Sequence, residues 1–309
     1  MSEEEIPSKR RRVLDQKDVS SKVNAKVLYN KILLHRARPV DLDRYGYPRP
    51  DGQHPEKAKF SNLSSVQPFN DSDNKTCVRC EKSFLLTESI ENTPDKKCVY
   101  HKRRSYQGKP HDCCGRRRGS RGCRTADNHV HNDNLRYTSN YIATINKTIP
   151  DDGSPGIYSI DGEMSYTVKG RELTKFTVVD HNSEVIYNEF VKPGCQIIDY
   201  NTEFSGITKS DIDGTTTTLK DVQNFCLEKF SSDTILIGHA VECILIALRL
   251  IHETIVDTAI VFPHPRGLPH KRALRTLAMN RLGRHIQSGT HNSKEGAVAC
   301  IDIILRHVK

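Results

Sequence analysis

Cysteine and histidine side chains in the first half of the chain are the residues best placed, by type and spacing, to bind a metal. Six of the ten cysteines fall between Cys77 and Cys123, and such uneven clustering indicates metal binding. Cys77 with Cys80 and Cys98 with His101 form two pairs with a gap of two residues, which lets both side chains reach one ion from a tight turn. The candidate ligands, in chain order, are Cys77, Cys80, Cys98, His101, Cys113, Cys114, Cys123 and His129.

These eight ligands match two closed zinc sites of four ligands each. The alternative is that the cysteines are free and buried, but the two short pairs together with the adjacent Cys113 and Cys114 favour zinc. The sequence does not show which ligand joins which ion, and His131 competes with His129 for the last position. No position looks open to water, so we expect about two structural zinc ions and no chemistry at them.

Asp161 and Glu163 are the acids best placed for a second kind of metal site. They come at the end of an apolar run that predicts a strand, and alternation along a strand puts residues two apart on one face. Two carboxylates on one face can share a divalent cation, and oxygen ligands suit Mg²⁺ or Mn²⁺. Because this spacing of two acids is very common, a solvated strand end is the alternative interpretation of the pair alone.

Positive charge is concentrated in residues 102–124, which hold nine Lys and Arg residues against a single acid, Asp112. The segment therefore carries +8 of the net charge of +9. Such a patch attracts polyanions, of which nucleic acid is the usual one, although a solvated loop is the alternative. We expect RNA to bind here through four arginines, Arg116, Arg117, Arg118 and Arg121.

Composition divides the chain into four parts. Residues 1–75 predict a largely disordered N-terminal region with a short amphipathic helix near 25–38. The Cys/His module follows at 76–132, and a polar linker follows at 133–155. Residues 156–309 are regularly patterned and predict a folded domain. No apolar run is long enough to span a bilayer, so we expect no membrane partner.

The folded domain begins with three short β-rich runs and continues with alternating helices and strands, a pattern that predicts an α/β fold with a mixed sheet flanked by helices. The predicted strands are Ile157–Asp161, Leu173–Val179, Val185–Val191, Thr234–Ile237 and Ile255–Ile260. The predicted helices are Leu219–Phe230, Val241–His252, Lys271–Leu282 and Lys294–His307.

Several ordered motifs in this domain resemble those of the DEDDh 3′→5′ exonucleases, and within them the RNA-exonuclease-one or GOR-antigen subgroup. The motifs are Ile160–Tyr166, Phe190–Pro193, Asp199–Thr202, Phe204–Thr208, Thr234–His239, Val256–Thr258 and Gly267–Pro269. The likeness covers nearly all of residues 156–309, and the Cys/His module resembles the CHORD-like zinc module that precedes the catalytic domain in that subgroup. The resemblance implies an RNase H-like sheet and phosphodiester hydrolysis at RNA 3′ ends by two metal ions.

In that family four acids hold the two metal ions and a histidine is the general base. Matched residue by residue, Asp161 and Glu163 supply the first two acids and His291 the base, a role that suits an imidazole. The third acid falls on Ile244 and the fourth on Gly296, and neither side chain can bind a metal. The resemblance therefore implies a family member with impaired or lost catalysis and weak binding of a single Mg²⁺ or Mn²⁺ at best.

No neighbouring acid is a good substitute. On ideal helices Glu242 points about 200° away from position 244, Glu295 lies about 100° from position 296, and Asp302 lies roughly 9 Å further along. Glu295 is the one acid that a distorted helix start would bring partly into reach.

The resemblance also suggests RNA contacts. Gly206, Ile207 and Thr208 look like the family's loop near the terminal nucleotide. The stretch from Arg266 to Arg284 holds six basic residues and no acid, which fits either a phosphate-contacting face or a solvated helix face.

Three functions remain open from the sequence: a residual RNA exonuclease, a non-catalytic RNA-binding pseudoexonuclease, and a scaffold that holds a protein partner through the zinc module. The missing acids favour the second over the first, and the basic segment favours the second over the third. The sequence names no protein partner. The short basic run Ser8–Arg12 indicates a nuclear protein, with the cytoplasm as the alternative.

Overall fold

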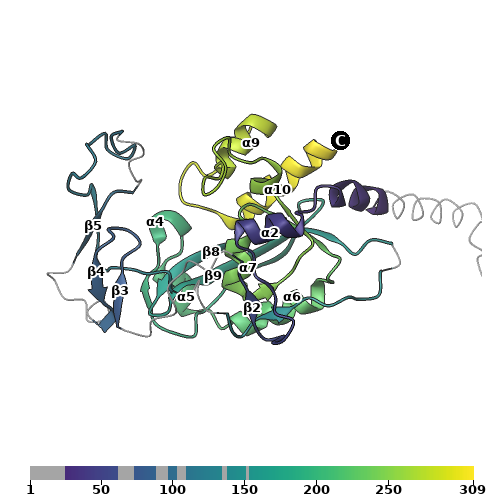
Figure 1. The fold of residues 1–309 in the computed structure, drawn as a ribbon, viewed down its shortest axis with the longest axis horizontal. Coiled ribbons are helices and arrows are strands. Elements are labelled where there is room, and N and C mark those ends of the chain that lie inside the picture. Colours follow the sequence, from purple (N-terminus) through teal and green to yellow (C-terminus); the bar gives the residue numbers. More distant parts are fainter. Residues whose placement is uncertain (1–24, 62–72, 88–96, 103–108, 134–137, 151–152) are drawn as a thin grey trace, which may run out of the picture.

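The computed structural model describes residues 25–61, 73–87, 97–102, 109–133, 138–150 and 153–309 (Figure 1). The predicted disorder of residues 1–24 and the basic run Ser8–Arg12 lie outside this part of the chain. The N-terminal helix covers residues 25–33, so it is shorter than the predicted 25–38. Arg38 is extended because a residue before proline avoids the helical region, and Pro39 then begins a second helix, α2 (Pro39–Tyr45).

The centre of the molecule is a six-stranded mixed sheet, which confirms the predicted α/β fold. Its strands lie in the order β10–β9–β8–β12–β14, and β11 pairs with the end of β8. The first three strands form an antiparallel meander, whereas β12 and β14 run parallel to β8. The bounds are β8 Ile157–Thr167, β9 Gly170–Asp180, β10 Val185–Phe190, β11 Ile197–Asp199, β12 Ile235–Gly238 and β14 Ile255–Asp257.

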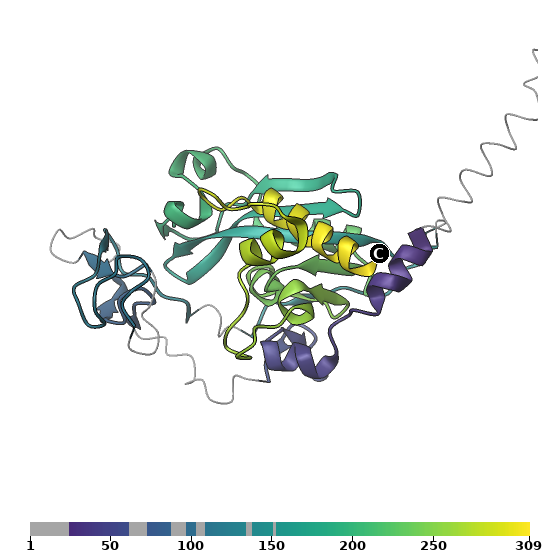
Figure 2. The ribbon, with the colours of Figure 1, turned by 90° about the horizontal axis from the view of Figure 1, so that it is seen from above.

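Helices cover both faces of this sheet, and each covered face has its own apolar core. On one face α10 (Ser293–Val308) and α9 (Leu274–Leu282) pack over Ile157, Ile237 and their neighbours, as Figure 2 shows for α10 in yellow. On the other face α6 (Leu219–Lys229) and α7 (Val241–Leu248) pack over Ile160, Phe176 and Leu236. Strand β12 is buried along its whole length because it lies between the two cores.

Two of the predicted elements in the folded domain end three or four residues earlier than expected. The helix predicted to reach His252 ends at Leu248, because Arg249 takes a left-handed backbone and β13 (Leu250–Ile251) then pairs with β7 (Ile142–Ala143). The strand predicted to reach Ile260 ends at Asp257, whose side chain accepts a hydrogen bond from the Ala259 amide and caps α8 (Thr258–Val261).

The Cys/His module lies beside the end of the sheet where β8 and β11 pair (Figure 1). It is built from two small antiparallel pairs, β3 (Asn74–Thr76) with β4 (Ser83–Leu85) and β5 (Cys98–Tyr100) with β6 (Arg124–Ala126). The remaining short elements are β1 (Arg49–Pro50), β2 (Ala58–Lys59), α4 (Thr202–Ser205) and α5 (Lys209–Asp213). No helix among the described residues is both long and apolar enough to cross a membrane.

Candidate nuclease cleft and zinc centres

A cleft of about 360 Å³ opens beside β8 at the middle of the sheet. Glu163 and His291, two of the predicted catalytic residues, line it together with the segment that runs from Asn201 to Ser205. Its charged lining is completed by Lys102, Arg171, Glu203 and Arg275. The cleft thus combines a predicted catalytic pair with cations from three separate parts of the chain.

Glu163 and His291 are in direct contact. The Nδ1 atom of His291 lies 2.6 Å from Oε1 of Glu163, and the Glu163 side chain is nearly buried. Burial by itself would lower the pKa of His291, but the hydrogen bond to Glu163 and the nearby charge of Asp161 outweigh it and raise this pKa to about 9. The imidazole is therefore protonated at neutral pH in this arrangement, and it can accept a proton only after its contact with Glu163 is released or that carboxylate is neutralised.

Asp161 is half-buried and lies against the start of α10 rather than among the residues that line the cleft. One of its oxygens accepts a hydrogen bond from the Gly162 amide at 2.8 Å. Burial raises the pKa of Asp161 to about 7, and the charge of His291 opposes that rise. A cation bound here would have to displace the proton that Asp161 partly carries at neutral pH.

The two positions that the family resemblance matches to metal-binding acids lie on opposite faces of β8. A Cβ atom placed on Gly296 would lie 2.0 Å from Oδ2 of Asp161, so the helix backbone itself covers this side of the carboxylate. Ile244 is buried in the core on the other face, where α7 packs, and its Cδ1 atom would lie 3.5 Å from a Cβ atom placed on Gly162. Neither Gly296 nor Ile244 offers a side-chain oxygen.

The three neighbouring acids are all engaged elsewhere. Glu242 is buried and forms an ion pair with Lys271. Glu295 accepts a hydrogen bond from the backbone amide of Gln287 at 2.8 Å, and Asp302 pairs with Arg284 at 2.7 Å. With only two carboxylates at the site, the described residues do not fit a pair of divalent cations.

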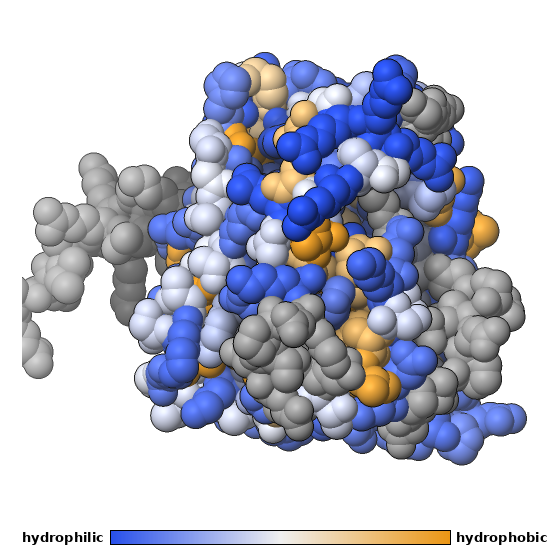
Figure 3. Space-filling model, turned by 90° about the vertical axis from the view of Figure 1, so that its left-hand side faces the viewer, coloured by the Kyte–Doolittle hydropathy of each residue, from blue (hydrophilic) through white to orange (hydrophobic). Residues whose placement is uncertain are grey.

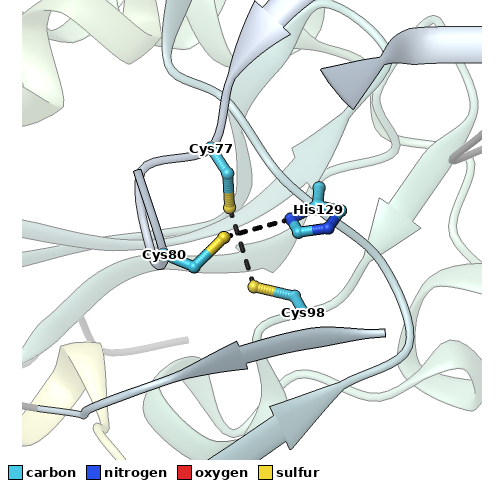
Figure 4. Close-up of side chains that lie close together, drawn as sticks. All are labelled: Cys77, Cys80, Cys98 and His129. Carbon is cyan, nitrogen blue, oxygen red and sulfur yellow. Dashed lines mark hydrogen bonds between the residues drawn. The ribbon is translucent and has the colours of Figure 1, made fainter. Parts of the chain in front are cut away.

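The first zinc cluster consists of Cys77, Cys80, Cys98 and His129, whose ligand atoms all lie within 4.8 Å of one another (Figure 4). The Cys77 and Cys98 sulfurs are 3.7 Å apart, and the Cys80 sulfur is 3.3 Å from Nδ1 of His129. Tetrahedral zinc with bonds of about 2.3 Å to sulfur and about 2.0 Å to nitrogen separates such ligands by roughly 3.5–3.8 Å. The set therefore has the size of a zinc site, and the four ligand atoms point toward one centre.

Electrostatics in the first cluster also suit a cation. The hydrogen bond from Cys98 lowers the pKa of Cys77 to about 4, and the same contact raises the pKa of Cys98. The lowered pKa of Cys77 favours its thiolate, which is the form that ligates zinc.

The second cluster consists of the other four predicted ligands, His101, Cys113, Cys114 and Cys123. Nδ1 of His101 lies 3.5 Å from the Cys114 sulfur and 3.8 Å from that of Cys113, which is 3.6 Å from the Cys123 sulfur. The other ring nitrogen of His101 contacts the Ser120 carbonyl at 3.1 Å, which fixes the orientation of the ring.

The two clusters decide questions that spacing left open. All eight predicted ligands fall into two sets of four, which the sequence did not divide. His131 belongs to neither set, because its Nε2 atom faces the Val168 carbonyl at 3.2 Å and its Nδ1 atom faces Asp133. His129, rather than its competitor, thus completes the first cluster.

The predicted RNA-binding residues are not among those that line the cleft. Arg116, Arg117, Arg118 and Arg121 are all exposed. The end of the molecule that carries the Cys/His module faces the viewer in Figure 3, and it is predominantly hydrophilic. Gly206 lies against the backbone of His291, where a Cβ atom would be 3.3 Å from the carbonyl oxygen.

The two residues after Gly206, Ile207 and Thr208, stabilise the fold and do not line the cleft. Ile207 is buried, and the Thr208 side chain forms a capping box with Asp211 at the start of α5. In this loop the residues that line the cleft are instead Asn201 and Glu203–Ser205, immediately before Gly206.

Three cations in the cleft were not singled out as cleft residues from the sequence. Lys102 comes from the zinc module, Arg171 from the start of β9 and Arg275 from α9. Arg275 belongs to the basic stretch Arg266–Arg284, and it is the one basic residue of that stretch in the cleft lining. No local sequence pattern marks these three cations as cleft residues, because tertiary packing brings them to the cleft.

A mixed sheet with Asp161 and Glu163 on its central strand and a histidine facing them defines a nuclease-like site. Along most of its length the chain is similar to proteins named as RNA exonucleases. It is 40% identical to the human RNA exonuclease 1 homolog over 291 residues. The aligned region covers 91% of this chain and 24% of that protein. It is also 40% identical over 291 residues to the human putative exonuclease GOR, covering 91% of this chain and 43% of that protein.

A fungal relative gives a similar result. RNA exonuclease 3 of Kluyveromyces lactis is 33% identical over 261 residues, covering 79% of this chain and 53% of that protein. These similarities support an exonuclease family for this chain, which spans between about a quarter and a half of the length of the three relatives. No family model matches the sequence.

Among solved structures, the Neurospora crassa Pan2 catalytic unit has a TM-score of 0.45 and 21% identity, over 54% of this chain and 30% of that one. The Saccharomyces cerevisiae Pan2 exonuclease module in complex with AAGGAA RNA has a TM-score of 0.44 and 22% identity, over 53% of this chain and 31% of that one.

Proposed function

We propose that this protein binds the 3′ end of RNA as a member of the DEDDh RNA exonuclease subgroup in which phosphodiester hydrolysis is impaired or lost. The observation that carries the proposal is the position of Gly296 and Ile244. Gly296 lies against Asp161 and Ile244 packs beneath Gly162, and these are the positions that the family resemblance matches to the two further metal-binding acids. RNA binding without efficient cleavage is the function that the remaining residues support best.

Two-metal hydrolysis needs one metal to activate water and both metals to stabilise charge on the attacking and leaving oxygens. Two carboxylates neutralise half as much metal charge as four, so any cation bound at Asp161 and Glu163 is held weakly. The cleft keeps the groups that contact nucleic acid, because Lys102, Arg171 and Arg275 present positive charge to a phosphate backbone.

The zinc module belongs to the same proposal. The two clusters of four ligands support about two structural zinc ions per chain, in a CHORD-like module that carries the basic segment beside the cleft. The basic run Ser8–Arg12 supports a nuclear location for the protein.

Residual exonuclease activity is the second candidate function, because one observation favours it. Glu163 and His291 lie together in the cleft at 2.6 Å, so the general base of the family retains its place. The scaffold hypothesis has no such specific observation.

A single comparison tests the proposal. The purified chain is incubated with 3′-labelled single-stranded RNA and Mg²⁺ or Mn²⁺, and its affinity for the same RNA is titrated at two salt concentrations. We expect salt-dependent binding with little or no trimming. Metal-dependent trimming that Asp161→Ala abolishes would replace the proposal by the residual-exonuclease function, and absence of any binding would remove RNA as the ligand.

A further inference from the structure

Arg79 lies inside the first zinc-binding turn, between the ligands Cys77 and Cys80, yet its side chain reaches the exonuclease-like domain. Its Nη1 atom is 2.5 Å from Oδ2 of Asp199, and its Nη2 atom donates to the side-chain oxygen of Asn201 at 3.3 Å. The guanidinium thus makes two contacts across the junction between module and domain.

This junction is largely buried. The Arg79 side chain is 9% exposed, and its guanidinium lies between the rings of Tyr100 and Tyr166 at 5.4 and 5.2 Å from their centroids. Beside it Val130, Tyr166 and Ile198 form an apolar cluster that joins the module to β8 and β11. A planar guanidinium that pairs with a carboxylate and also stacks on two rings cannot be replaced by a lysine without loss of contacts.

The partners of Arg79 lead directly to the cleft. Asp199 also accepts a hydrogen bond from the Asn201 amide at 2.7 Å, and Asn201 holds the left-handed backbone (φ 56°) from which α4 begins. Asn201 and the α4 residues Glu203–Ser205 line the cleft, and the Phe204 carbonyl accepts a hydrogen bond from the His291 amide at 2.8 Å. Continuous contacts therefore connect the zinc-binding turn to the backbone of His291.

A second contact ties the module to the same segment. Lys102, which directly follows the zinc ligand His101, places its ammonium 2.9 Å from Glu203 and 4.7 Å from the centre of the Phe204 ring. This pair is partly exposed, so it stabilises the junction less than the buried Arg79 does. Its importance is its position, because Lys102 is the one basic residue in the described part of the module that lines the cleft.

We propose that Arg79 is a positioning residue of the cleft, which couples zinc binding in the first cluster to the shape of the Asn201–Ser205 wall on which RNA lies. Zinc orders the turn that carries Arg79, Arg79 holds Asp199 and Asn201, and these residues hold α4 against His291. The inference rests on the proposed function only in taking RNA as the ligand.

The coupling is tested first without RNA, by hydrogen exchange of the full chain. We expect exchange of residues 199–206 to rise about tenfold in Arg79→Ala, while elemental analysis still finds the wild-type zinc content. Asp199→Asn, which removes the same contact from the other side of the junction, should have a similar effect. Removal of zinc from the wild-type chain should loosen the same segment.

The matched control is Lys59→Ala, which removes one cation from β2, outside the cleft. If exchange of residues 199–206 is the same in Arg79→Ala, in zinc-free protein and in the control, the positioning role is wrong, whatever the protein does with RNA. This result leaves the proposed function intact.

RNA affinity gives the second readout. We expect Lys102→Ala to weaken binding of single-stranded RNA about threefold and Arg79→Ala about tenfold, with Lys59→Ala unchanged. The double variant Arg79→Ala/Lys102→Ala should bind no more weakly than Arg79→Ala, because the Arg79 change already releases the wall that presents Lys102. If the losses of RNA affinity in the two single variants add up in the double variant, the proposed coupling is wrong. If the wild-type protein binds no RNA, only the proposed function is wrong.

Discussion

At the scale of single residues, the proposed loss of catalysis rests on Gly296 and Ile244. Gly296 presents helix backbone to Asp161 and Ile244 packs apolar atoms beneath Gly162, so neither position supplies the carboxylate that the family resemblance implies there. The carboxylates that remain are partly neutralised by the protein itself, through the contact of Glu163 with His291 and the raised pKa of Asp161.

Restoring both acids should restore hydrolysis. We expect Ile244→Asp/Gly296→Asp to trim 3′-labelled RNA with Mn²⁺ or Mg²⁺ well above the wild-type level. Each single change should do little, because the metal ligands act as a unit. The double variant should unfold at a lower temperature without metal, since a charge replaces buried Ile244 and a new Cβ crowds Asp161, and added Mn²⁺ should recover part of this loss.

The control is the same double variant with Asp161→Ala, which should show no trimming. Equal, weak activity in the wild-type chain and in Ile244→Asp/Gly296→Asp would show that something other than the missing acids limits the reaction.

The buried side chain of His252 should make the free energy of unfolding depend on pH in the acid range. Its ring is buried between Thr144 and the Thr234 carbonyl, at 2.8 Å from each, and burial lowers its pKa to about 4 from the ordinary 6.5. The unfolded chain therefore binds a proton at higher pH than the folded chain does. The free energy of unfolding should fall as pH drops from about 6.5 to 4, by ~3 kcal/mol in total, and this contribution should level off below pH 4.

Denaturant unfolding at several pH values measures this slope. His252→Gln keeps hydrogen-bonding capacity without titrating, so it should remove about this share of the acid dependence. An identical pH profile in the variant would exclude His252 as the cause.

At the scale of elements, we expect zinc at the two Cys/His clusters to take the place of a hydrophobic core in the Cys/His module. The described residues of the module form only short strand pairs and a small buried cluster around Phe84 and Tyr100, which is too little to stabilise such a fold unaided. We expect about two zinc ions per chain by elemental analysis, and about one after either Cys98→Ser or Cys123→Ser, since each change breaks one set of four. Protein that contains no zinc would contradict this prediction.

The arginines Arg116, Arg117 and Arg118 of the basic segment are exposed on this module and should act through charge alone. Replacing Arg116, Arg117 and Arg118 by alanine should weaken binding of all RNA sequences alike. It should also reduce the slope of log K against log salt by about 2, since each single-strand phosphate contact contributes about 0.7. If affinity does not change, RNA does not bind at this surface.

At the scale of the whole molecule, the cleft is a joint product of the module and the sheet. The cleft is lined by three cations that are distant in sequence, Lys102, Arg171 and Arg275. The module brings Lys102 there by packing against β8 and β11, and the packing of α9 against α10 positions Arg275. A ligand that spans these cations touches both parts of the chain, so loss of zinc should change RNA binding even at residues of the sheet.

The sequence by itself determined the features that depend on local geometry. Short spacings such as Cys77 to Cys80 fix how two ligands converge, and alternation fixes that Asp161 and Glu163 share a strand face, so both motifs were readable without a fold. The mixed sheet was predicted from the order of β-rich and helical segments, whereas the absence of acids at Ile244 and Gly296 is what the family resemblance implies.

Only the tertiary structure decided the features that depend on contacts between distant residues. It divided the eight zinc ligands into two sets, chose His129 over His131, and ended α7 at Leu248, where a strand pairing replaces the last helical turn. It also placed Lys102 in the cleft and Arg79 across the junction. Neither position has a local pattern, because each is set by how two separately folded surfaces pack together.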